Sequence, residues 1–125
     1  MMDNIAIVNG AYEGFAKGDI PAVLDALADD VSWNAPRTLP HGGSFTGKAG
    51  VGEFFQGIGA NWSSLNLELH GVTALSADAV VAVVSATGER TSGGAGGYGA
   101  AHVFTIANGK VTRFQEYVDL DAPMS

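Results

Sequence analysis

The sequence contains no cysteine, and this absence excludes both disulfide bonds and thiol catalysis. Cations are also few: 6 lysines and arginines stand against 13 aspartates and glutamates, for a formal net charge of −7. Such a surface disfavours nucleic acid and anionic membranes as partners. No apolar stretch is long enough to span a bilayer, and no basic segment precedes a signal-like apolar core, which predicts a cytoplasmic protein.

The composition that remains is that of a globular protein. Of the 125 residues, 46% are hydrophobic and 15% are charged. These proportions predict a single domain over residues 1–125 with one hydrophobic core, because the chain is too short to build a second. Neither a repeat nor a linker interrupts it.

Helices are predicted in the first half of the chain. Asp3 can cap a helix over residues 4–17, Gly18 ends it, and Asp19 starts a second helix with Pro21 in its first turn. A short strand over 31–35 and a loop over 37–47 follow, and apolar residues at helical spacing predict a third helix over 48–60.

The remainder of the chain is predicted to be strands, over residues 65–74, 79–87, 100–106 and 111–119. The run 79–84 is apolar at every position, which is typical of a strand covered on both faces. The glycine-rich residues 94–99 are predicted to form a flexible hairpin loop. Helices followed by antiparallel strands indicate an α+β fold.

The last two strands form a predicted hairpin with one apolar face, in which His102 and Glu116 are embedded. The other members of that face are Phe104, Ile106, Thr112, Phe114 and Val118. A two-residue turn on Asn108-Gly109 would put His102 beside Gln115. A three-residue loop over 107–109 keeps even-numbered residues on one face, so the apolar pattern favours it. An acid and a base in an apolar face suit a small-molecule pocket.

Three segments carry a resemblance to a known family: KGDIPAVLDALADDVSW, FTGKAGVGEFF and NGKVTRFQEYVD. With the order of elements, they resemble the nuclear transport factor two-like superfamily, and more narrowly the SnoaL-like and ketosteroid-isomerase-related proteins, over nearly the whole chain. The resemblance implies a cone-shaped fold in which three N-terminal helices pack on a strongly curved, mainly antiparallel sheet around an apolar pocket. Members commonly pair through the sheet, so it also implies a homodimer.

Glu116 is the leading candidate for a catalytic residue. Burial beside Phe104, Phe114 and Val118 would disfavour its charged form and bring it toward general-base strength. An exposed strand glutamate is the alternative, if the other register holds. The resemblance adds that this position matches the acid that activates water in limonene-epoxide hydrolases and the acid that handles a substrate proton in SnoaL-type cyclases.

His102 is the second catalytic candidate and lies diagonal to Glu116 in the favoured register. It could orient the carboxylate or donate a hydrogen bond to an enolate or alkoxide oxygen, and a core histidine bonded to a backbone carbonyl is the alternative. In the cyclases that the chain resembles, a histidine on this strand accompanies the acid.

The chain also departs from its relatives. Ala35 stands where ketosteroid isomerase has its general base, and Ala11 stands where that enzyme has a helix-one tyrosine, with Tyr12 next to it. Residues 79–87 carry no charge, so the arginine–aspartate pair of limonene-epoxide hydrolases is missing. The SnoaL-type pair of His102 with Glu116 therefore survives best.

Further side chains are predicted to line the pocket, although plain core packing is the alternative for each aromatic ring. They are Tyr12, Trp33, Phe55, Trp62, Phe104, Phe114 and Val118. His41 is expected in solvent at the mouth of the pocket, and His70 on the surface. The three histidines lack metal-ligand spacing, so neither a metal nor another cofactor is expected.

These inferences predict a protein that binds a small apolar or weakly polar organic molecule. If it is an enzyme, it is a cofactor-independent isomerase, cyclase or hydrolase in which Glu116 moves a proton and His102 stabilises the oxygen that gains charge. Two alternatives remain open: ligand binding without turnover, and a structural dimer whose own side chains fill the cavity.

Overall fold

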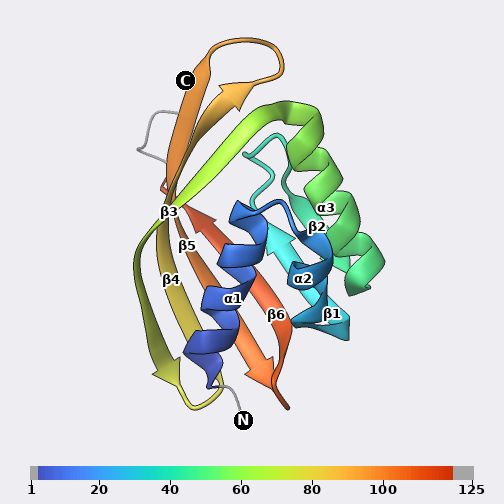
Figure 1. Ribbon diagram of the computed structural model, residues 1–125, viewed down its shortest axis with the longest axis vertical. Coiled ribbons are helices and arrows are strands. Elements are labelled where there is room, and N and C mark those ends of the chain that lie inside the picture. The colour runs from blue at the N-terminus through green and yellow to red at the C-terminus, as the bar shows by residue number, and fades with distance from the viewer. Residues whose placement is uncertain (1–2, 120–125) are drawn as a thin grey trace.

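Figure 1 shows the computed structural model, which describes residues 3–119. Its elements are α1 (Asn4–Ala16), α2 (Ile20–Asp25), β1 (Leu27–Ala35), β2 (Gly43–Thr46), α3 (Gly47–Asn61), β3 (Trp62–Ser76), β4 (Ala79–Arg90), β5 (Ala95–Ala107) and β6 (Lys110–Val118). All 6 strands join one sheet in the order β2-β1-β6-β5-β4-β3. Neighbouring strands are antiparallel except β1 and β6, which are parallel. The sheet curves around the helices without closing, so the predicted α+β fold is confirmed.

The helices begin where the sequence predicts. The Asp3 side chain accepts a hydrogen bond from the Ala6 amide at 2.7 Å, and Asp19 accepts one from the Ala22 amide at 3.2 Å. Each carboxylate satisfies an amide that has no partner within the helix. Gly18 separates α1 from α2 with a φ of +72°, a conformation that glycine adopts without steric cost.

The sheet contains more of the chain than the sequence pattern indicated. β1 begins at Leu27 rather than at residue 31, and β2 lies inside the predicted loop and pairs with β1. The prediction of a loop over 94–99 is wrong from Ala95 onward, because those residues pair with β4. Glycine permits this close pairing: a Cβ atom on Gly97 would lie 2.7 Å from the Ala86 carbonyl oxygen of β4.

The turn between β5 and β6 is the one that the hydrophobic pattern disfavoured. Ala107 pairs with Lys110 across a two-residue turn, in which Asn108 has a φ of 53° and Gly109 a φ of 78°. These positive values are typical of a type I′ hairpin turn. The prediction of a three-residue loop is therefore wrong.

The predicted apolar face nevertheless forms, because β6 contains a bulge. Ile106 pairs with Val111, but Thr105 pairs with Arg113, which leaves Thr112 as an extra residue. A bulge shifts the register by one position and so reverses the alternation that the short turn imposed. His102 consequently lies directly opposite Glu116 rather than diagonal to it.

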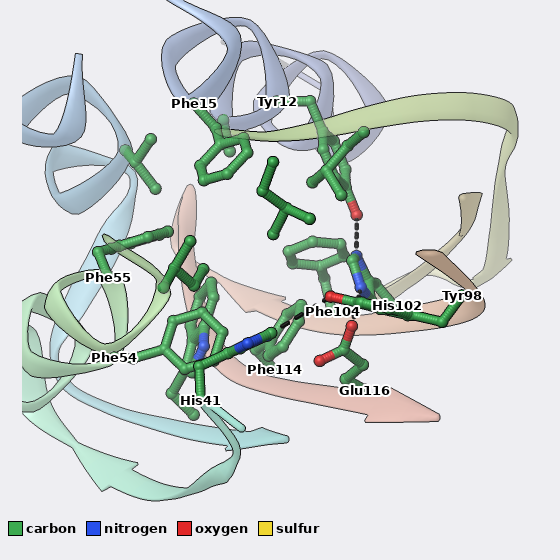
Figure 2. A pocket seen from close by; sticks show the side chains of 16 residues that line it. Tyr12, Phe15, His41, Phe54, Phe55, Tyr98, His102, Phe104, Phe114 and Glu116 are labelled. Carbon is green, nitrogen blue, oxygen red and sulfur yellow. Dashed lines mark hydrogen bonds and ion pairs between the residues drawn. The ribbon is translucent and has the colours of Figure 1, made fainter. Parts of the chain in front are cut away.

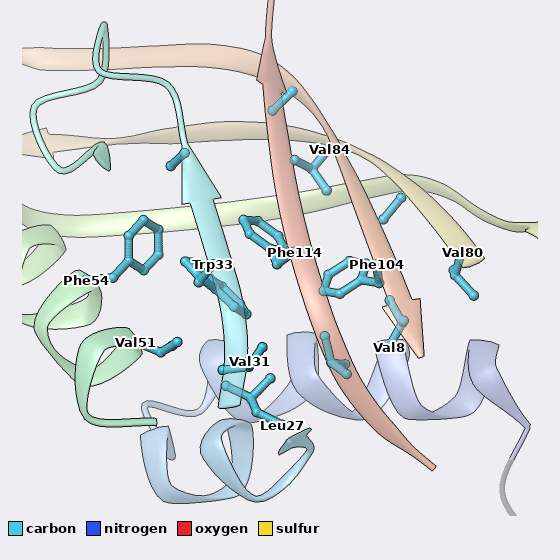
Figure 3. Close-up of a cluster of buried hydrophobic side chains, with 14 of the residues drawn as sticks. Val8, Leu27, Val31, Trp33, Val51, Phe54, Val80, Val84, Phe104 and Phe114 are labelled. Carbon is cyan, nitrogen blue, oxygen red and sulfur yellow. The ribbon is translucent and has the colours of Figure 1, made fainter. Parts of the chain in front are cut away.

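The core fills the space between the helices and the concave face of the sheet (Figure 3). Val8 from α1, Val31 from β1 and Val51 from α3 are completely buried in it. The outer face of β4 differs from the prediction: Val80 and Val84 are buried, but Val83 is 48% exposed. The prediction that this strand is covered on both faces is therefore wrong at Val83.

Among residues 3–119, no helix is both long enough and apolar enough to cross a membrane. A cytoplasmic location stays a prediction.

Candidate active site

A pocket lies between α1, α3 and the concave face of the sheet (Figure 2). Most of its lining is apolar, and five of its side chains carry titratable groups: Tyr12, His41, Tyr98, His102 and Glu116. The apolar lining residues are Ala11, Phe15, Val23, Trp33, Phe54, Phe55, Ile58, Leu65, Leu67, Phe104 and Phe114. The structure therefore brings both catalytic candidates together with five of the predicted lining residues.

Two predicted lining residues lie elsewhere. Trp62 is the first residue of β3, and its buried ring packs against Tyr98 at a centroid distance of 6.5 Å, with the Arg90 guanidinium 5.7 Å from the ring centroid. Val118 pairs with Ala100 beyond the position of Glu116 and is half-buried. Neither residue belongs to the pocket lining.

His41 lines the pocket, and the expectation that it lies in solvent is wrong. Its side chain is 4% exposed. The loop turns it inward through two consecutive hydrogen bonds, from the Leu39 amide to the Pro36 carbonyl and from the Gly42 amide to the Leu39 carbonyl. Gly42 makes this path possible, because a Cβ atom there would lie 1.8 Å from the Pro36 oxygen.

A chain of hydrogen bonds connects α1 to the two central strands. The Tyr12 hydroxyl lies 2.5 Å from His102 Nδ1, and His102 Nε2 lies 2.8 Å from Glu116 Oε2. Because an ionised carboxylate only accepts, Nε2 donates to it, and a neutral ring then accepts the Tyr12 proton at Nδ1. His102 and Glu116 are 5% and 4% exposed, so water does not compete for these bonds.

The second carboxylate oxygen of Glu116 differs from the first in having no hydrogen-bond partner among the described residues. Oε1 is buried and accepts no hydrogen bond from any residue that the structure describes. Figure 2 shows this oxygen directed away from His102 and toward the aromatic side chains. A carboxylate oxygen with free lone pairs in an apolar pocket can accept a proton from a bound molecule.

A second chain involves His41. Trp62 Nε1 donates to His41 Nδ1 at 3.4 Å, and His41 Nε2 lies 3.4 Å from the Tyr98 hydroxyl. Burial lowers the pKa of His41, and the negative charge of Glu116 opposes part of that effect. The ring is therefore held neutral.

Both tyrosines of the pocket stay protonated. Burial raises the pKa of Tyr12 and of Tyr98 well above the usual range, and the charge of Glu116 raises both further. Loss of the proton would create a buried phenolate next to an anion, which costs free energy. Each hydroxyl is thus available as a hydrogen-bond donor.

The apolar part of the site is built from stacked and tilted rings. Trp33 stacks on Phe114 with a centroid distance of 3.9 Å and an interplanar angle of 14°. Its indole Nε1 is buried and has no hydrogen-bond partner among the described residues. The cavity that these rings line has a volume of about 60 Å³.

Within residues 3–119, no three histidine or acidic side chains are grouped in a way that could hold a metal ion. The polar groups of the site are suited to proton transfer and hydrogen bonding.

Comparison with known proteins gives this arrangement a family. Residues 8–114 match the model of the SnoaL-like domain. The chain belongs to the SnoaL-like family. Among curated protein sequences, no match to this SnoaL-like chain was found.

Solved structures give the same fold. An NTF2-like protein of unknown function from Burkholderia pseudomallei has 26% sequence identity and a TM-score of 0.87, covering 95% of this chain and 92% of that one. TerC co-crystallised with polyporic acid has 26% identity and a TM-score of 0.83, covering 93% and 91%. A Mycobacterium tuberculosis protein in complex with estradiol-17beta-hemisuccinate has 22% identity and a TM-score of 0.79, covering 96% of each chain, and this shows a shared fold only.

Proposed function

We propose that this SnoaL-like protein binds a small, flat, largely apolar organic molecule and catalyses cofactor-free proton transfer on it, with Glu116 as the general base. The observation that carries the proposal is the unpartnered Oε1 of Glu116 in an aromatic pocket. A purely structural carboxylate would be expected to bond both oxygens, because an unsatisfied buried acceptor costs about 1–3 kcal/mol.

The roles of the residues follow from their contacts. Oε1 takes a proton from the carbon next to a carbonyl group, and the electron pair of the broken C–H bond forms an enolate with its charge on oxygen. His102 holds Oε2 and so keeps Oε1 aimed into the pocket. Return of the proton to a different carbon is isomerisation, and attack of the enolate carbon on a second carbonyl is an aldol-type cyclisation.

The relatives support the binding part of the proposal. TerC has been crystallised with polyporic acid, and the Mycobacterium tuberculosis protein with a steroid ester. Both ligands are organic molecules held by proteins of this fold. The reaction itself rests on the geometry of Glu116 alone.

The test uses 2-indanone, a flat ketone whose CH₂ groups next to the carbonyl exchange with solvent deuterium through the enolate. We expect the wild-type protein to accelerate this exchange in D₂O, followed by NMR, and Glu116→Gln to lower the acceleration by at least about 100-fold. The matched control is Glu89→Gln, since Glu89 is exposed and lies outside the pocket.

Three results would contradict the proposal in different ways. Exchange that survives in Glu116→Gln removes Glu116 as the base. Binding of 2-indanone without any acceleration leaves a ligand-binding protein with no turnover. Failure of the wild-type protein to bind the ketone, in a titration of ¹⁵N-labelled protein, excludes this class of ligand.

We also propose a homodimer that pairs through the outer face of the sheet. Val83, Ala101 and Tyr117 are cross-strand neighbours there, and Val83 and Tyr117 are 48% and 58% exposed. Val83→Lys should lower the sedimenting mass to that of a monomer, whereas Ser92→Lys in the exposed β4–β5 turn should not. A monomeric wild-type protein would contradict this.

A further inference from the structure

We propose that Tyr98 is a second catalytic group, fixed as a hydrogen-bond donor by His41 and Trp62, and that it holds the carbonyl oxygen of the ketone whose α-proton Glu116 removes. This inference rests on the proposed function and narrows it to substrates that present an oxygen acceptor.

The direction of the hydrogen bonds around His41 follows from the chemistry of its partners. The indole N–H of Trp62 can only donate, so His41 Nδ1, which lies 3.4 Å from it, must accept. A neutral imidazole carries one proton, and the only remaining place for it is Nε2. Since burial lowers the pKa of His41, the doubly protonated form that would break this pattern is disfavoured.

The proton on Nε2 then determines what Tyr98 does. His41 Nε2 lies 3.4 Å from the Tyr98 oxygen and must donate to it. If Tyr98 donated instead, both nitrogens of His41 would have to be acceptors, which no neutral imidazole allows. The Tyr98 hydroxyl therefore accepts from His41 and has its own proton left for another group.

That proton belongs to a side chain of the pocket that contains Glu116. Tyr98 is 6% exposed and lines the same pocket as Glu116, and it shares the inward face of β5 with His102. Burial and, to a smaller extent, the charge of Glu116 raise the pKa of Tyr98, so the hydroxyl keeps its proton. One presents a free acceptor and the other a free donor, which is the pair of groups that enolisation of a ketone requires.

The step balances without any further reactant. Glu116 Oε1 gains the proton and the α-carbon loses it; the C–H electron pair becomes the C=C bond, and the carbonyl π electrons move to the oxygen. Tyr98 donates a hydrogen bond to that oxygen throughout and keeps its proton. Such a donor acts most strongly in the transition state, where the oxygen becomes negative.

The first test needs no ligand. The ¹⁵N shifts of the imidazole nitrogens report which of them carries the proton. We expect the Nε2–H tautomer at His41 in the wild-type protein, and a mixture of tautomers in Trp62→Phe, which removes the donor and keeps an aromatic ring. An Nδ1–H tautomer in the wild-type protein would overturn the proposal, because Tyr98 would then be the donor to His41.

The second test compares 2-indanone with indane, which has the same ring system without the oxygen. Removing one hydrogen bond should weaken ketone binding to Tyr98→Phe about tenfold and leave indane binding unchanged. Ser92→Ala is the control, because it removes an exposed hydroxyl from the β4–β5 turn, outside the pocket. Ketone exchange should fall by about 100-fold in Tyr98→Phe.

The two proposals fail in different ways. If Tyr98→Phe binds and exchanges 2-indanone as the wild-type protein does, while Glu116→Gln does not exchange it, then Tyr98 has no role and Glu116 keeps its own. If Glu116→Gln exchanges the ketone normally, the proposed base is wrong and this inference is wrong with it. Equal loss of ketone and indane binding in Tyr98→Phe would indicate a packing defect and would also overturn the donor role.

Discussion

Two buried histidines face the same pocket, and they differ in what their partners allow. His102 lies between a tyrosine and a carboxylate, both of which can either donate or accept when their protonation changes. His41 lies between a tyrosine and a tryptophan, and the tryptophan can only donate. The first chain ends on a charged group, whereas the second consists of neutral groups only. The comparison shows that the same residue type can hold a buried charge or orient a neutral hydroxyl, depending on its neighbours.

The largest effect is expected at His102. His102→Leu leaves the buried Glu116 carboxylate without its only hydrogen-bond partner among the described residues, and we expect a loss of about 3–5 kcal/mol in the free energy of unfolding. Urea denaturation at neutral pH measures it. The double variant His102→Leu with Glu116→Leu should recover most of the loss, because no buried charge is left. A loss below about 1 kcal/mol in the single variant would show that the buried Glu116 carboxylate does not depend on its hydrogen bond from His102.

The pair of His102 with Glu116 could be predicted because its signal is periodic. Alternating apolar residues in two strands place both side chains on one face, and this pattern indicated the correct face although it implied the wrong turn. The turn itself was mispredicted, since the short type I′ turn and the bulge at Thr112 cancel one another. A one-residue bulge leaves no mark in the hydrophobic pattern, and so the sequence indicates the face but not the pairing.

His41 could not be predicted because its position depends on a loop. The inward path needs the Gly42 backbone to approach Pro36 at a distance that no side chain would tolerate. Periodicity carries no information about such a contact. Trp62 was predicted to line the pocket as one of several aromatic side chains, with core packing as the alternative, and it packs in the core. The α+β fold was predictable from the order of helices and strands, whereas two polar residues of the pocket, His41 and Tyr98, were not predicted to lie there.

A smaller loss of stability is expected when the hydrogen bonds of His41 to Trp62 and Tyr98 are removed. His41→Leu removes the acceptor of Trp62 Nε1 and the donor to Tyr98, both of which are neutral groups. We expect the free energy of unfolding to fall by about 2 kcal/mol, less than for His102→Leu, because no charge is left unpaired. Urea denaturation of both variants in the same buffer makes the comparison. An equal or larger loss at His41 would reverse the interpretation of the two chains.

The loss of stability at acid pH should also distinguish buried His41 from an exposed histidine. The pKa of His41 is lowered in the folded protein, so below about pH 6.5 the unfolded chain binds a proton that the folded protein does not. Stability contributed by neutral His41 is thus lost as the pH falls from 7 toward 5, by at most about 1.4 kcal/mol per pH unit. His41→Leu should flatten this slope in urea denaturation. His70→Gln, at an exposed histidine, should keep it. Identical slopes in wild-type protein and His41→Leu would show that His41 is protonated in the folded state.

The smallest effect is expected for removal of the Tyr98 hydroxyl, which His41 orients. Among the described residues, the Tyr98 hydroxyl has one hydrogen-bond partner, His41 Nε2, from which it accepts. Tyr98→Phe therefore loses that bond alone. We expect a cost of about 1 kcal/mol, measured by urea denaturation.

At alkaline pH the same substitution is expected to protect the protein. Burial raises the pKa of Tyr98, so above about pH 10 the unfolded chain loses a proton that the folded protein retains, and stability falls as the pH rises. Tyr98→Phe should therefore be less destabilised by alkali than the wild-type protein. If the free energy of unfolding falls equally with alkaline pH in both proteins, the Tyr98 hydroxyl is in contact with solvent. It would then not be the donor that His41 orients.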